Sequence, residues 1–142
     1  MNRAAACAAG LIFVLMAFAC SGHEDELSGT SWSLILLGPA GFPEPVLFGV
    51  GVTAKFSESG SEISGSGGCN SYSGSYKADG TSFTAEALSW TERGCLEPAG
   101  VMEQEDRFLR LLASAETFAI SGLRLTIAGA GDQVLVFLRT EE

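Results

Sequence analysis

The stretch Ser71–Ala85, SYSGSYKADGTSFTA, predicts a β-hairpin. Tyr72 and Tyr76 alternate with serines, and a period of two is typical of a strand with one buried face. Asp79-Gly80 then supplies the positive φ angles that a tight hairpin turn needs. Phe83 marks the buried face of the returning strand. Because hairpins join neighbouring antiparallel strands, this stretch indicates a mainly β fold.

Segments with the same period lie on both sides of this hairpin. In 31–37, for example, Trp32, Leu34 and Leu36 fall on one face. About eight short strands are expected among nine segments of this kind, 31–37, 52–57, 62–67, 71–77, 81–85, 87–91, 117–121, 123–128 and 134–139, with an edge piece at 46–48. A sheet this long curls, and closing it removes exposed edges. The sequence therefore predicts a small antiparallel β-barrel or a strongly curved sheet.

One segment, 100–115, has helical spacing instead. Its predicted apolar stripe, which includes one acidic residue, consists of Val101, Met102, Glu105, Phe108, Leu109 and Leu112. The stripe needs a sheet to cover, so we expect one α-helix across an opening or a face of the barrel. The expected core aromatic side chains are Trp32, Phe56, Phe83, Trp90, Phe108 and Phe137.

The most specific motifs surround the hairpin. Gly68-Cys69-Asn70 precedes Y-x-G-x-Y at 72–76, T-x-x-x-C follows at 91–95, and E-x-x-F follows at 105–108. From Trp32 to Phe137 this order resembles the META domain (HslJ-like) family of bacterial envelope proteins. The resemblance implies a compact β-barrel with one helix, often on a lipoprotein or secreted precursor. It also implies a link to heat stress and aminocoumarin tolerance, and no established catalytic reaction.

The N-terminal sequence has the features of a targeting segment. Residues 1–19 combine Arg3, an apolar run and the ending Ala17-Phe18-Ala19, which is typical of a secretory signal peptide. Cys20 follows the expected cleavage site and is predicted to be lipidated, although the lipobox is atypical. The alternative is a secreted, unlipidated protein with a spare thiol. We expect 20–28 to be the lipidated cysteine with a short acidic tether, and 29–142 to be the domain.

Cysteine count supports this interpretation. Cys7 leaves with the signal peptide, so acylation of Cys20 leaves two thiols, Cys69 and Cys95. In an oxidising compartment these two are predicted to form a structural disulfide. A redox role is the rival hypothesis, but it would favour a C-x-x-C spacing or a strongly basic setting.

Charge and composition exclude several classes of function. The formal net charge is −9, and a phosphate-binding protein needs a basic face, so no nucleic acid is expected. The single histidine, His23, argues against a metal site, a cofactor or a His-activated nucleophile in the domain. The 17 carboxylates fall into no recognisable catalytic arrangement, so we expect no enzyme.

Polar residues of the motifs are the candidate site. Asn70, Tyr72, Tyr76, Thr91 and Arg93 either line a polar-aromatic pocket or serve the structure of the turn. Asn70 suits a turn because asparagine tolerates left-handed backbone angles. Buried tyrosine and asparagine usually need only hydrogen-bond partners, which favours the structural interpretation.

Two functional hypotheses follow. The first is a non-enzymatic envelope lipoprotein that maintains the cell surface under stress through a protein partner. The second is a small-barrel binding module for an apolar or aromatic ligand. The lipid anchor would place the protein on the outer membrane, facing the periplasm, in a host that has one. Otherwise we expect a secreted or periplasmic protein.

Overall fold

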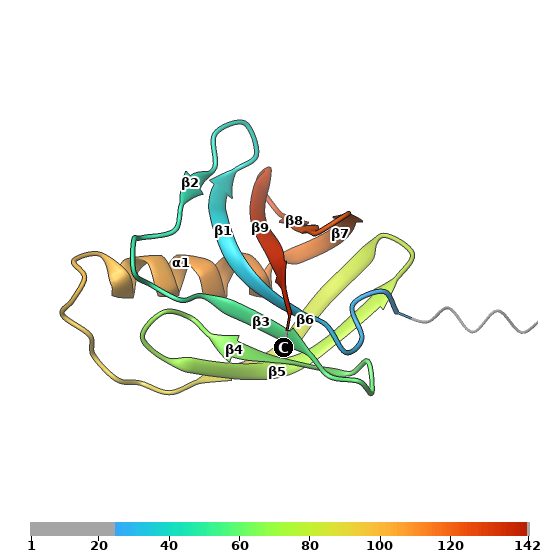
Figure 1. Ribbon diagram of the computed structural model, residues 1–142, viewed down its shortest axis with the longest axis horizontal. Helices are drawn as coiled ribbons and strands as arrows, with labels where there is room; N and C mark the ends of the chain where they lie inside the picture. The colour runs from blue at the N-terminus through green and yellow to red at the C-terminus, as the bar shows by residue number, and fades with distance from the viewer. Residues whose placement is uncertain (1–24, 142) are drawn as a thin grey trace, which may run out of the picture.

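The computed structural model describes residues 25–141, which form a β-barrel with one helix (Figure 1). The strands are β1 (Ser31–Pro39), β2 (Glu44–Pro45), β3 (Thr53–Phe56), β4 (Glu62–Ser66), β5 (Ser71–Asp79), β6 (Ser82–Trp90), β7 (Ala115–Ser121), β8 (Arg124–Gly129) and β9 (Gln133–Thr140), and the helix is α1 (Val101–Ala113). All strand pairings among them are antiparallel.

The sheet closes on itself because β1 pairs with β9 along its whole length, from Ser31 opposite Thr140 to Pro39 opposite Gln133. The barrel order is β1-β3-β4-β5-β6-β7-β8-β9, and the two-residue β2 adds to the end of β1. The predicted mainly β barrel with one helix is therefore confirmed. The expected edge piece at 46–48 is displaced, because Glu44 and Pro45 make the pairing instead.

The helix α1 covers one opening of the barrel. In an antiparallel barrel alternate strands end at the same opening, so the end of β4, the start of β5 and the end of β6 lie together. Side chains of α1 reach two connections and one strand at that opening: Glu105 bonds the turn 67–70, Gln104 bonds Leu47 in the β2–β3 connection, and Arg107 pairs with Glu44 of β2. We call this opening the helix end.

The opposite opening is filled by the start of the described chain. Leu27 is fully buried in the core, and the Tyr76 hydroxyl donates to the Asp25 carboxylate. Residues 25–28 therefore belong to the folded domain, and the predicted tether 20–28 overlaps it. The burial of a single leucine behind acidic residues explains why composition alone assigned these residues to a linker.

Aromatic rings fill the barrel interior. Trp32, Phe56, Phe83, Phe108 and Phe137 have no exposed surface, and Phe56 and Phe108 each make edge contacts with other rings. These five were predicted core residues. The prediction for the sixth residue, Trp90, is wrong. Its side chain is 49% exposed, because it lies at the end of β6 where the strand leaves the barrel.

Two bulges shift the predicted alternation. In β1 the register changes between Leu34 and Leu36, so Leu37 turns inward in place of the expected Leu36. In β6 a second irregularity lies at Ala87, whose φ is 51°, and the two short strands expected at 81–85 and 87–91 form one continuous strand. Within residues 25–141, no helix has the length and apolar character needed to span a membrane.

Candidate functional site

The turn 67–70 between β4 and β5 packs directly against α1. A Cβ atom on Gly67 would lie 2.8 Å from the Glu105 side chain, and Gly68 adopts a φ of 124°. Only glycine fits both requirements, a close approach at the first position and a positive φ at the second. The glycine pair of the motif is thus explained by the approach of the helix.

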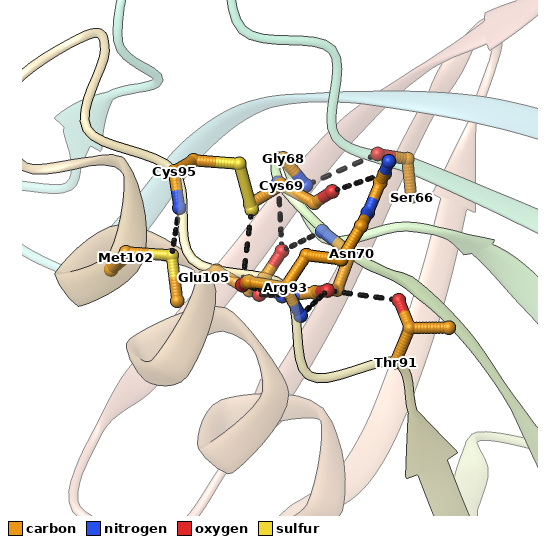
Figure 2. Close-up of a disulfide and its surroundings, with 9 residues drawn as sticks. All are labelled: Ser66, Gly68, Cys69, Asn70, Thr91, Arg93, Cys95, Met102 and Glu105. Atoms are coloured by element: carbon orange, nitrogen blue, oxygen red, sulfur yellow. Dashed lines mark hydrogen bonds between the residues drawn. A yellow bond between two sulfur atoms is a disulfide. The ribbon is translucent and has the colours of Figure 1, made fainter.

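A disulfide fastens the same turn to the segment after β6. Cys69 and Cys95 are bonded, with their Cα atoms 6.0 Å apart, within the normal range for disulfides. This confirms the predicted pairing. The bond holds the connection that leads into α1 beside the turn 67–70 (Figure 2).

Glu105 is the acceptor at the centre of this cluster. Its Oε2 accepts the backbone N–H groups of Cys69 at 2.8 Å and Asn70 at 2.6 Å, and its Oε1 accepts the Asn70 side-chain amide at 2.6 Å. The side chain is only 3% exposed. A buried carboxylate is costly unless several donors satisfy it, and here three do.

Asn70 links this carboxylate to the segment after β6. Its Oδ1 accepts the Thr91 hydroxyl at 2.9 Å and the Arg93 backbone N–H at 2.7 Å, while its Nδ2 also donates to the Arg93 carbonyl at 3.1 Å. The Arg93 guanidinium returns a bond to the Cys69 carbonyl at 3.0 Å. Three predicted site residues, Asn70, Thr91 and Arg93, therefore lie together (Figure 2).

Tyr72 and Tyr76 lie apart from that cluster, in the barrel interior. The Tyr72 hydroxyl donates to the Thr53 carbonyl at 2.7 Å, and its ring packs on Phe108. Burial raises the pKa of Tyr72 above its ordinary value of 10.0. Burial also raises the pKa of Tyr76, and the adjacent Asp25 carboxylate raises it further. The five residues therefore do not line a single pocket: two belong to the core and three to the fastened turn.

Glu105 is the central residue that sequence reasoning did not assign to the site. It was placed only in the helix stripe and in the E-x-x-F motif. A glutamate at a position of an otherwise apolar stripe was the available signal, since a buried acid needs partners. Its partners come from a turn 35 residues away in the sequence, which no helical pattern reveals.

A surface depression of about 350 Å³ borders the cluster, between the end of β6 and α1. Trp90, Met102 and Leu109 give it an apolar part. Its charged lining residues are Glu92, Glu105 and Asp106 against the single cation Arg93. The depression is therefore amphipathic and acidic.

A second depression, of about 400 Å³, lies on the outer face of β3–β6. Its lining is mostly small and hydroxylic, with Ser57, Ser64, Ser73, Ser75 and Ser89 among its members. Across residues 25–141, no group of three His, Cys, Asp or Glu side chains converges to hold a metal ion. The expectation that the domain binds no metal and no cofactor stays a prediction.

Comparison with known proteins identifies the family of this chain. The family model described as "META domain" matches residues 25–142. The chain belongs to the META domain family. The match begins at Asp25, the residue that bonds Tyr76 at the barrel opening. No curated protein matches this META domain chain.

Solved structures share the META domain fold. The NMR structure of a protein from Burkholderia xenovorans has a TM-score of 0.67 and 25% identity, covering 82% of this chain and 85% of that one. A second NMR structure has a TM-score of 0.61 and 27% identity, covering 79% and 90%. The crystal structure of a DUF4847 family protein from Bacteroides vulgatus, 14% identical with a TM-score of 0.59 over 85% and 99%, shares the fold alone.

Proposed function

We propose that this META domain protein is a non-enzymatic envelope lipoprotein that maintains the cell surface under stress by binding a protein partner. The observation that carries the proposal is a pair of apolar side chains on two loops of the helix end. Phe48 is fully exposed, and Leu96 is 92% exposed. Exposed large apolar side chains that gather on one surface mark sites of protein interaction.

Both loops are held by the structure. The Leu47 N–H donates to Gln104 Oε1 at 2.8 Å, next to Phe48. The Cys69–Cys95 disulfide holds the residue next to Leu96. The two loops lie at the same end of the molecule, beside the start of α1 (Figure 1). A fixed backbone presents the two side chains with little entropy left to lose on binding.

The position of the N-terminus favours a protein partner over the bilayer. Asp25 and Leu27 fill the opening opposite the helix end. A lipid on Cys20, five positions before Asp25, would hold that opposite opening toward the membrane. Phe48 and Leu96 would then face away from the bilayer and toward other envelope proteins.

The alternative, a barrel that encloses a small apolar ligand, has less support. The interior space such a ligand would need is occupied by the fully buried rings of Trp32, Phe56, Phe83, Phe108 and Phe137. The network around Glu105 likewise has its donors and acceptors engaged within the protein. Neither region offers the free group or the space that ligand enclosure or catalysis requires.

Site-specific photo-crosslinking in cells tests the partner. A photoreactive amino acid at Phe48 or at Leu96 is expected to give one discrete crosslinked protein, the same from both positions and more abundant after heat stress. The matched control is Leu123, an exposed apolar residue in the β7–β8 turn at the opposite end. Equal products from Leu123, or none from Phe48 and Leu96, would remove the proposal.

Mass spectrometry of the mature N-terminus tests the envelope anchor. Cys20 lies outside the described residues. The proposal expects the chain to begin at Cys20 and to carry acyl chains on it. A mature chain with an unmodified Cys20 thiol would show that the protein is secreted or periplasmic and not anchored.

A further inference from the structure

The seam between β6 and β7 is the weakest closure of the barrel. Their pairing consists of Ser82 opposite Thr117, together with the bond from the Phe118 N–H to the Thr81 carbonyl. By contrast, β6 pairs with β5 along its whole length, from Asp79 opposite Ser82 to Tyr72 opposite Trp90. Most of β6 therefore has a strand on one side only, and α1 lies close to β6.

The hydrogen-bond alternation shows which backbone groups face that open side. The Thr91 N–H bonds the Ser71 carbonyl, so in this antiparallel pair Trp90 occupies the intervening, non-bonded position relative to β5. Ala85 also occupies a non-bonded position relative to β5. The residue opposite it on β5 is Tyr76, whose N–H bonds the Ser61 carbonyl on the side of β5 that faces β4. The N–H and C=O groups of Ala85 and Trp90 therefore point toward the seam. Ala85 is only 8% exposed, so the accessible part of this edge lies at Trp90.

The depression of about 350 Å³ lies where this open edge meets α1. Trp90 is half exposed at its border and, with the half-buried Met102, offers an apolar contact surface. Its exposed charged lining consists of Glu92 and Asp106 against Arg93, since Glu105 is buried and bonded to the turn 67–70, and the whole chain has a net charge of −9. Charge complementarity therefore favours a cationic occupant.

We propose that the open edge of β6 beside α1 is a strand-addition site for an extended cationic peptide segment with alternating apolar residues. Strand addition takes its affinity from backbone hydrogen bonds and its selectivity from alternate side chains. Apolar residues of the segment pack on Trp90 and Met102, and basic residues face Glu92 and Asp106. Asp106 already pairs with Arg110, but both side chains are largely exposed, so a ligand cation displaces this pair at small cost.

This surface differs from the one formed by Phe48 and Leu96, so the inference goes beyond the proposed function and does not depend on it. The probe for the strand-addition site is a short fluorescein-labelled peptide of alternating lysine and valine. We expect saturable binding by fluorescence anisotropy. A peptide of alternating glutamate and valine should not bind, nor should a lysine-valine peptide N-methylated along one edge, which cannot form the ladder.

Amide hydrogen exchange locates the added strand. In the free protein the Trp90 amide should exchange rapidly and the Ser89 amide slowly, since Ser89 lies in a bonded position opposite Ser73. The lysine-valine peptide should slow exchange at Trp90 and leave Ser89 unchanged. Trp90→Ala should weaken binding about tenfold, whereas Phe48→Ala, which removes another exposed aromatic side chain, should not.

Three results would overturn the inference. They are the absence of saturable binding at millimolar peptide, equal binding of the N-methylated peptide, and slow exchange at Trp90 before any peptide is added. Because crosslinking from Phe48 and Leu96 reports on the other surface, failure of one proposal leaves the other intact. The circular dichroism spectrum of the Trp90→Ala variant should match that of the wild type. Weaker peptide binding by this variant would then not be due to loss of fold.

Discussion

Glu105 is the residue on which the attachment of the helix most depends. One buried carboxylate accepts three hydrogen bonds from Cys69 and Asn70, and Asn70 in turn holds Thr91 and Arg93. Removing the acceptor would leave those donors buried without partners, and each such donor costs about 1–3 kcal/mol. This explains why an acidic residue occupies a core position of an otherwise apolar helix face.

Glu105→Ala is expected to lower the free energy of unfolding by about 3 kcal/mol or more. Glu105→Gln should lower it less, because one side-chain oxygen still accepts the backbone N–H groups. Glu103→Ala is the matched control: Glu103 is exposed on the same helix and should cost about 0.5 kcal/mol or less. Urea unfolding measures all three, and Glu105→Ala behaving like Glu103→Ala would contradict this role.

Tyr72 and Tyr76, the two tyrosines of the chain, should make the protein sensitive to alkali. Both pKa values are raised in the folded state, so the folded protein holds these protons more tightly than the unfolded chain does. Their contribution is fully present below the ordinary tyrosine pKa of about 10 and is lost as the pH rises above it. Tyrosinate absorbance should therefore appear together with unfolding.

Tyr72→Phe separates the two effects of this residue. At about pH 8 it should cost roughly 1 kcal/mol, because the Thr53 carbonyl loses its hydrogen bond. Above about pH 10 stability should fall less steeply than in the wild type, since one of the two shifted groups is gone. Urea unfolding across this pH range measures the slope. An unchanged slope would mean that Tyr72 ionises as readily folded as unfolded.

At the scale of elements, the sequence predicted the strands and the helix well. It predicted less well which residues of each strand face the core. The alternation around Tyr72 and Tyr76 correctly marked buried positions. The bulges in β1 and β6 could not be read from it, because an extra residue is set by the neighbouring strand and not by local propensity. For the same reason Leu36 was assigned to the core in place of Leu37.

The site was predictable in its covalent part and not in its polar part. The Cys69–Cys95 pair followed from counting thiols, given the oxidising compartment that the predicted signal peptide implies. Asn70, Thr91 and Arg93 were recognised as a group through the motif. Their common partner Glu105 was not assigned to the group, because the contact joins two elements whose packing depends on the whole barrel. The same dependence placed Tyr72 and Tyr76 in the core and apart from that group.

The disulfide joins two elements, and its loss should act mainly through the unfolded chain. It closes a loop with a sequence separation of 26, for which chain entropy gives about 3.5 kcal/mol. Cys69→Ser and Cys95→Ser should each lower the melting temperature, and the double variant should match either single one. If both variants melt like the wild type, or if thiol titration finds Cys69 and Cys95 free, the structural role is wrong.

At the scale of the whole molecule, the two ends of the barrel are closed in different ways. The helix end is closed by α1, fastened through Glu105 and the disulfide, and carries the exposed Phe48 and Leu96. The other end is closed by Leu27, next to the chain that leads back to Cys20. With both ends closed and aromatic rings between them, the barrel is a packed scaffold, and we propose that it presents surfaces and does not enclose a ligand.

Native mass spectrometry of the protein purified from the cell envelope tests this packed-scaffold account most directly. The protein is released from detergent micelles inside the instrument, so a small molecule held in the barrel would remain with it. The account predicts the mass of the processed chain with its covalent lipid and one disulfide, and no further small molecule. A stoichiometric small molecule that persists on release and is lost on unfolding would contradict it.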